Sequence, residues 1–163
     1  MKYKLLTIAL LTFSSMAFAQ GGSSLWKSTT KKSDFVALDS RMNLPERNLF
    51  SLDLSAMKTA LTGAPKRDAN VVSAVVLMLP NAAGKLEHFR VYENSNMDPE
   101  LEAKYPDIKS YLGKGIDDVN ATAYFSMSPL GFKSMVLAAD KSATFIEPIS
   151  KDATMYTVYS KQD

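Results

Sequence analysis

The side chains that most often carry enzyme chemistry are scarce in this sequence. His88 is the only histidine, and the chain has no cysteine. A His-Glu-x-x-His zinc motif needs two histidines, so it cannot be formed here. A Ser-His-Asp hydrolase would have to use His88, and no G-x-S-x-G turn is present to hold the serine. We therefore predict that this chain is not an enzyme and has no cofactor of its own.

Residues 113–118, GKGIDD, are the stretch most open to a chemical interpretation. Two glycines without a third glycine or a following helix are weak evidence for a phosphate-binding loop. Asp117 and Asp118 could offer carboxylates to calcium, although no further oxygen ligands follow them in the usual spacing. The alternative is a pair of solvated acids that end a turn. On its own, the pattern predicts a glycine-flanked loop and no specific chemistry.

The N-terminus has the pattern of an export signal. Lys2 and Lys4 precede a short apolar run, and an A-x-A site ends at Ala19. We predict a signal peptide over residues 1–19, cleaved between Ala19 and Gln20, and a secreted or periplasmic protein. Residues 20–33 follow as a flexible leader, in which Trp26 is expected to dock on the domain rather than to serve a ligand.

Removal of the signal peptide changes the charge of the chain. Of the 19 basic residues, 17 remain without Lys2 and Lys4, and they balance 17 acidic residues. A neutral mature chain lacks the basic surface that nucleic-acid binding and anionic lipid binding require. We therefore predict no nucleic-acid partner and no membrane attachment once the signal has been removed.

The remaining elements predict a β-rich domain over residues 34–163. Leu54, Met57 and Leu61 recur at helical spacing, with Ser55 or the competing Asp53 as the cap. A second short helix is expected after Asp98 and Pro99, which suit the N-cap and the first helical position. The strands are expected in seven short stretches: 71–79, 86–93, 107–113, 121–127, 132–139, 143–149 and 155–160.

The pattern of those strands sets the expected fold class. The first of them, residues 71–79, is a continuous apolar run that predicts a strand buried on both faces. Short strands joined by tight turns such as NAAGK and SPLG predict an antiparallel meander. The fold class is therefore α+β and mainly β, with one domain and two short helices.

Several longer segments support a family resemblance. The most specific are PELEAKYPDIKSYLGKGIDD and SPLGFKSMV, supported by LPERNLFSLDLSAMKTALTGAPKR and VVLMLPNAAGKLEHFRVYENSNM. In this order they resemble the N-terminal propeptide of secreted reprolysin-like zinc metallopeptidases of Bacteroidetes. The likeness covers about residues 41–163. NAAGK departs mildly from the aspartate-x-glycine turn that is usual in that family.

The resemblance implies a prodomain that assists the folding of a zinc metalloendopeptidase and keeps it latent. Its partner would be the catalytic domain, in cis or in trans, and the zinc would belong to that domain. The chain ends at Asp163, where such proteins lead toward the catalytic domain, so we expect a fragment. The alternative is a free-standing secreted binding module or a diffusible protease inhibitor.

A latency function would require an inhibitory face on this chain. Without cysteine there is no thiol to place on the metal, but a carboxylate can also bind zinc. The candidate face comprises Tyr111, Gly113, Gly115, Ile116, Asp117 and Asp118, with Asp117 or Asp118 as the zinc ligand. The alternative remains that both acids end a turn and are solvated.

Overall fold

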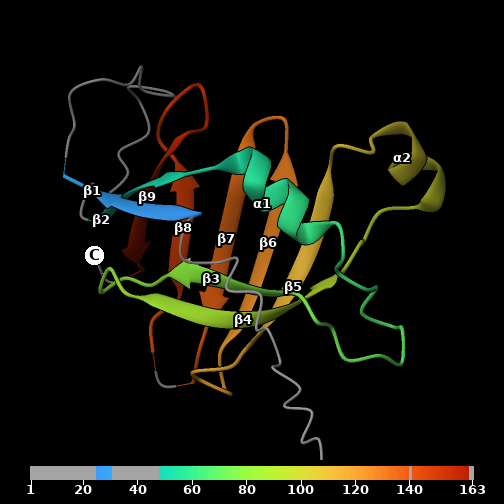
Figure 1. Ribbon diagram of the computed structural model, residues 1–163, viewed down its shortest axis with the longest axis horizontal. Helices are drawn as coiled ribbons and strands as arrows, with labels where there is room; N and C mark the ends of the chain where they lie inside the picture. Colours follow the sequence, from blue (N-terminus) through green and yellow to red (C-terminus); the bar gives the residue numbers. More distant parts are fainter. Residues whose placement is uncertain (1–24, 31–47, 140, 162–163) are drawn as a thin grey trace, which may run out of the picture.

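One antiparallel sheet forms the body of the protein (Figure 1). The computed structural model describes residues 25–30, 48–139 and 141–161. Within these residues the strands are β1 (Trp26–Thr29), β2 (Asn48–Leu52), β3 (Val76–Pro80), β4 (Leu86–Glu93), β5 (Lys109–Gly115), β6 (Thr122–Ser128), β7 (Gly131–Leu137), β8 (Thr144–Pro148) and β9 (Met155–Ser160). Their order in the sheet is β1-β2-β9-β8-β7-β6-β5-β4-β3. The predicted α+β, mainly β meander is therefore confirmed.

The sheet curls so that its two ends share one hydrophobic core. The core cluster contains side chains from each of the nine strands and from helix α1 (Leu54–Leu61). Figure 1 shows α1, β3 and β4 in front of β5, β6 and β7. One hydrogen bond connects the two ends of the curled sheet: Asn48 Nδ2 donates to the Ala82 carbonyl oxygen at 2.6 Å. This bond joins β2 to the β3–β4 turn, although the two are far apart in the sheet.

Helix α1 follows the apolar spacing that predicted it. Met57 and Leu61 are its buried residues, and both pack into the core. Of the two candidate caps, Asp53 is the one used, because its carboxylate accepts a hydrogen bond from the Ala56 amide at 2.9 Å. Ser55 lies inside the helix.

Helix α2 (Pro99–Lys104) is held by ionic contacts rather than by burial. Asp98 caps it as predicted, and none of its residues is buried. Lys109 Nζ lies 2.8 Å from Glu102 of the helix and 2.9 Å from Glu93 of β4. These hydrogen bonds, that to Glu102 above all, raise the pKa of Lys109 above its usual range. Neither α1 nor α2 has the length and hydrophobicity that a membrane span requires, a statement limited to the described residues.

The predicted flexible leader needs correction. Residues 26–29 lie within its bounds of 20–33, yet they form β1 and pair with β2. Leu25 and Trp26 are both 3% exposed and belong to the core. Trp26 makes edge contacts with the rings of Phe50, Phe132 and Tyr156. It docks as expected, but as a central core residue. The predicted signal peptide and cleavage site, residues 1–20, lie outside the described residues.

The strand predicted at residues 71–79 begins later than expected, and it is an edge strand instead of a strand buried on both faces. β3 begins only at Val76, and it is the last strand at one edge of the sheet. Val71 and Val72 are exposed. The intervening chain is held by side chains of β4, because Arg90 donates to the Ser73 carbonyl oxygen and Tyr92 Oη accepts from the Ser73 amide. One backbone hydrogen bond, from the Val91 amide to the Val75 carbonyl oxygen at 2.9 Å, joins the segment to β4 just before β3 begins.

The two predicted turns that contain glycine are confirmed. Gly84 in the β3–β4 turn has a φ of 76°, and Gly131 at the start of β7 has a φ of 103°. Residues with a Cβ rarely adopt this conformation. Gly131 also has no room for a side chain, since an added Cβ would lie 2.7 Å from the Cβ of Ala153.

Alkaline solution is expected to weaken the fold through Tyr156. This residue is fully buried, and its hydroxyl oxygen accepts a hydrogen bond from the Phe132 amide at 3.1 Å. Burial raises the pKa of Tyr156 to about 12. The unfolded chain loses this proton near pH 10, so the folded state binds more protons between pH 10 and 12, and stability falls as the pH rises. We expect a loss of roughly 2–3 kcal/mol across that window.

Urea unfolding of the wild type and Tyr156→Phe at several pH values above 9 measures this effect. The variant should be less stable at pH 8 but less sensitive to the rise in pH. Tyr159, whose pKa burial also raises to about 12, is retained in both proteins and cancels in the comparison. Equal pH slopes for the two proteins would contradict the assignment to Tyr156.

Candidate functional site

The segment GKGIDD forms the end of β5 and a tight turn into β6. The Gly115 amide donates to the Ala121 carbonyl oxygen, and the Ala121 amide donates to the Asp118 carbonyl oxygen, each at 2.9 Å. A Cβ on Gly115 would lie 2.0 Å from the Asp118 carbonyl oxygen. The second glycine is therefore needed so that the turn can pass close to the end of its own strand.

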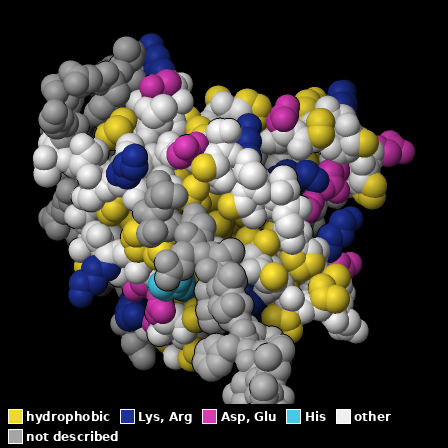
Figure 2. Space-filling model, in the orientation of Figure 1, with side chains coloured by type: hydrophobic (Ala, Val, Ile, Leu, Met, Phe, Trp, Pro, Cys, Tyr) yellow, Lys and Arg dark blue, Asp and Glu magenta, His cyan; other side chains and the backbone are white. Residues whose placement is uncertain are grey.

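Asp117 is bound to the only histidine. One of its carboxylate oxygens accepts from the His88 amide at 2.7 Å and lies 2.8 Å from His88 Nδ1. These hydrogen bonds, the backbone one first, lower the pKa of Asp117. Figure 2 shows the histidine beside acidic side chains at the surface. The Ile116 amide also donates to the His88 carbonyl oxygen, so the loop is fastened to β4 at this point.

Asp118 is bound to a lysine from a distant part of the chain. Its carboxylate accepts from Lys141 Nζ at 2.7 Å and from the Asn120 amide at 3.1 Å. The lysine first, and then the amide, lower the pKa of Asp118, and the same contact raises the pKa of Lys141. Neither acid is free in this structure: each carboxylate has partners within the chain.

The six residues of the predicted inhibitory face do not share one surface. Tyr111 is buried, and its ring stacks on Phe125 with the ring centres 5.2 Å apart. Gly113 is buried as well, and a Cβ there would lie 3.0 Å from the Cβ of Phe89. Tyr111 and Gly113 therefore belong to the core, which corrects their assignment to an exposed face. Of the other four residues, Ile116 and Asp117 are exposed, and Gly115 and Asp118 are partly exposed.

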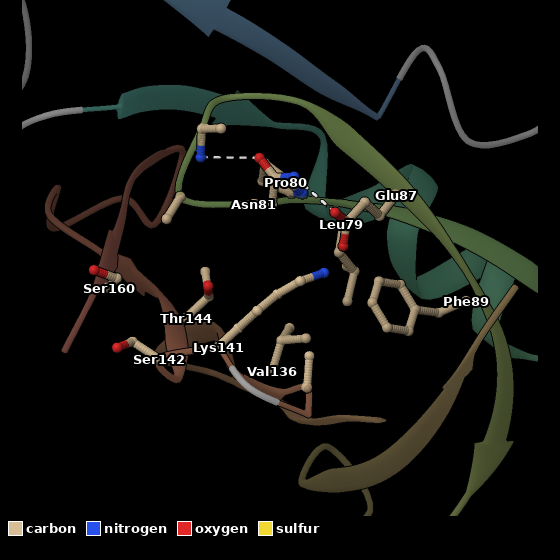
Figure 3. A pocket seen from close by; sticks show the side chains of 13 residues that line it. Leu79, Pro80, Asn81, Glu87, Phe89, Val136, Lys141, Ser142, Thr144 and Ser160 are labelled. Carbon is tan, nitrogen blue, oxygen red and sulfur yellow. Dashed lines mark hydrogen bonds between the residues drawn. The ribbon is translucent and has the colours of Figure 1, made fainter. Parts of the chain in front are cut away.

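Lys141 connects this turn to a cavity of about 470 Å³. The cavity lies between the β3–β4 turn and the ends of β7, β8 and β9. Figure 3 shows Lys141 extending across it toward Phe89 and Glu87. Apolar and polar residues line it together: Leu79, Pro80, Asn81, Ala82, Ala83, Glu87, Phe89, Val136, Ala138, Lys141, Ser142, Thr144 and Ser160.

Two members of this site, His88 and Lys141, were not assigned to it by sequence reasoning. His88 is half-exposed on β4, and nothing in its own segment places it beside Asp117. Lys141 lies 23 positions from Asp118, in a segment with no motif. No local signal could have identified either pair, because both depend on how β4, β5 and the β7–β8 connection meet.

Two carboxylates with lowered pKa values lie in an exposed turn, each with a basic or imidazole neighbour that could be exchanged for a group on another molecule. Within the described part of the chain, no three or more His, Cys, Asp or Glu side chains are grouped so as to hold a metal ion. A single carboxylate from this turn could still complete the coordination of a metal held by a partner.

Comparisons with known proteins leave the chain without an assigned relative. No family model, no curated protein and no solved structure matches it.

Proposed function

We propose that this chain is the prodomain of a secreted zinc metalloendopeptidase, which assists the folding of the catalytic domain and keeps it latent. The observation that supports this most is where the resembling segments lie. PELEAKYPDIKSYLGKGIDD comprises α2, β5 and the acidic turn, and SPLGFKSMV comprises the next hairpin turn and most of β7. Together with β3 and β4, the resemblance therefore covers consecutive strands of one sheet, rather than scattered short matches.

In this proposal the turn at residues 116–118 enters the substrate cleft of the catalytic domain. Asp117 is the better candidate for the metal of that domain, because its side-chain partner is an imidazole, whereas Asp118 is paired with the ammonium group of Lys141. A zinc ion of the catalytic domain would take the place of the His88 imidazole at this carboxylate, and the hydrogen bond from the His88 backbone amide could remain.

An inhibition assay tests the proposal. The mature chain, residues 20–163, is added to a reprolysin-like metallopeptidase from the same organism. We expect the wild type to inhibit hydrolysis of a fluorogenic peptide and Asp117→Ala to raise the inhibition constant at least tenfold, about 1.4 kcal/mol. A smaller rise in the inhibition constant is expected for Asp118→Ala, because in the wild-type chain the Asp118 carboxylate remains paired with Lys141 and does not reach the zinc. Asp107→Ala, an exposed acid that precedes β5, is the matched control.

Three outcomes separate the elements of this proposal. Inhibition by the wild type that is unchanged in both Asp117→Ala and Asp118→Ala would exclude a carboxylate on the zinc while retaining the prodomain. A wild-type chain that neither inhibits nor binds the peptidase would contradict the prodomain itself. Equal losses in Asp107→Ala and Asp117→Ala would show that surface charge in general, and not this turn, is responsible.

A free-standing secreted binding module or diffusible inhibitor remains the alternative function. It would use the same surfaces in trans, and the inhibition assay alone does not separate it from a prodomain. The coding sequence beyond Asp163 does, because only a prodomain is followed by its own catalytic domain.

A further inference from the structure

The cavity beside Lys141 has the size and position of a small-molecule site. Its volume of about 470 Å³ lies within the range of roughly 300–1,000 Å³ that such sites occupy. The curled sheet brings β3, β4 and their connecting turn to one side of it and the ends of β7, β8 and β9 to the other (Figure 3). The mouth of a sheet that curves back on itself is a frequent position for a bound ligand.

The apolar part of the lining is fixed by the core. Leu79, Phe89 and Val136 line the cavity and also belong to the core cluster, so packing holds them in place. Ala82 and Ala138 line it as well, and their small side chains leave room for a ligand. An apolar group placed against this wall would be removed from water, which favours its binding.

Two opposite charges face the cavity. Glu87 and Lys141 are the only ionisable side chains among the described residues that line it. The hydrogen bond to Asp118 first, and also the negative charge of Glu87, raise the pKa of Lys141, so the lysine is protonated at neutral pH. Figure 3 shows the lysine extended toward Glu87, although in the described part of the chain the two form no ion pair with each other. A ligand in the cavity would therefore meet one positive and one negative group.

Both charged groups keep hydrogen-bonding capacity for a ligand. Glu87 Oε1 accepts from Asn81 Nδ2 at 2.7 Å, whereas Glu87 Oε2 has no partner among the described residues. Lys141 Nζ donates to Asp118 at 2.7 Å, which uses one of its three N–H groups. One carboxylate oxygen and two ammonium protons therefore remain for a bound molecule.

A free α-amino acid with a large apolar side chain matches these features. Its ammonium group would donate to Glu87 Oε2, its carboxylate would accept from Lys141 Nζ, and its side chain would lie against the apolar wall. A simple carboxylic acid would bring its charge close to Glu87 without balancing that repulsion, and a simple amine would do the same beside Lys141. The two charges therefore favour a zwitterion over either ion.

We propose that this cavity binds an apolar α-amino acid, held between Glu87 and Lys141. The inference goes beyond the proposed prodomain function and does not depend on it, because the ligand is bound by this chain alone. In the complex, Lys141 serves two carboxylates, that of the ligand and that of Asp118.

Titration of the mature chain with L-leucine and L-phenylalanine, followed by the NMR shifts of the backbone amides, tests the site. Leucinamide, which lacks the carboxylate, and 4-methylpentanoate, which lacks the ammonium group, are the comparison ligands. The titrations are made at about pH 6.5, below the pKa of an α-amino group. We expect both amino acids to bind saturably, and each comparison ligand to bind about tenfold more weakly than leucine, because a charged hydrogen bond is lost.

Substitutions of the two charged residues locate the ligand. Glu87→Gln and Lys141→Gln should each weaken leucine binding about tenfold. Asp118→Asn breaks the same ion pair as Lys141→Gln but keeps the lysine, so it should bind leucine at least as tightly as the wild type. Glu100→Gln and Lys151→Gln alter exposed charges that do not line the cavity, and they should change the affinity less than about twofold. Thermal unfolding of each variant establishes that it is folded before it is titrated.

Several results would overturn this inference. One is the absence of saturable binding by either amino acid, and another is equal affinity for leucine, leucinamide and 4-methylpentanoate. Unchanged binding in Glu87→Gln and Lys141→Gln would place the ligand elsewhere. Equal losses in Lys141→Gln and Asp118→Asn would show that the lysine only holds the turn. Because the titration contains no peptidase, a chain that inhibits the peptidase but binds no amino acid overturns this inference alone, and the reverse result overturns only the prodomain function.

Discussion

Replacing Trp26 with alanine is expected to lower the free energy of unfolding by about 4 kcal/mol, the cost of removing a large aromatic side chain from a packed core. Trp26 is 3% exposed and has the rings of Phe50, Phe132 and Tyr156 around it, with centres 5.4 to 6.3 Å away. These rings belong to β2, β7 and β9, so one side chain connects the β1–β2 hairpin to the body of the sheet. A loss of this size is a large part of the stability of an ordinary domain.

Urea unfolding measures this effect, with two variants for comparison. Trp26→Phe keeps an aromatic ring in the site and should cost less than half as much. It removes no hydrogen bond from the described residues, because Trp26 Nε1 has no acceptor among them. Lys27→Ala alters the exposed neighbour on the same strand and should change stability by less than about 0.5 kcal/mol. A Trp26→Ala protein as stable as the wild type would show that β1 is not part of the folded core.

The second large effect is expected at Gly115, where alanine should cost about 3 kcal/mol. The added Cβ would lie 2.0 Å from the Asp118 carbonyl oxygen and 3.0 Å from that of Ala121. Both atoms are backbone, so the clash cannot be relieved by a side-chain rotation. The turn must move, and with it the carboxylates of Asp117 and Asp118. Gly115→Ala should therefore reduce both stability and inhibition of the peptidase.

Gly63→Ala is the matched control for this substitution. Its added Cβ would meet only the Val75 side chain, at an ordinary contact distance of 3.5 Å. We expect its stability to remain within about 0.5 kcal/mol of wild type. Unfolding of both variants, followed by inhibition assays at equal folded concentration, separates loss of fold from loss of the turn. Equal stability of Gly115→Ala and the wild type would mean that the turn is looser than the structure has it.

Local signals in the sequence were sufficient for the greater part of the fold. The cap Asp98, the turns at Gly84 and Gly131, and the stretches that form β4 to β9 are each determined by neighbours within a few residues. For α1 the sequence left Ser55 and Asp53 as alternative caps. Because consecutive strands joined by tight turns pair with one another, the order from β3 to β9 followed from the turns alone.

The two ends of the sheet could not be predicted in the same way. β1 is four residues with exposed Lys27 and Ser28 at its centre, and its position depends on Trp26 entering a core formed by distant strands. The apolar residues 71–75 read as a buried strand, but Arg90 and Tyr92 hold that segment by hydrogen bonds to Ser73 instead. Both errors arise where long-range packing overrides local propensity.

For the candidate site, the sequence indicated the turn but not its partners. The acids at 117 and 118 stood out by type, whereas their contacts with His88 and Lys141 depend on tertiary structure.

The central claim, that this chain is the prodomain of a zinc metalloendopeptidase, is tested most directly by reading the gene beyond the codon for Asp163. The account predicts an open reading frame in which a His-Glu-x-x-His motif follows within a few hundred codons. A stop codon immediately after Asp163 would contradict it for this chain.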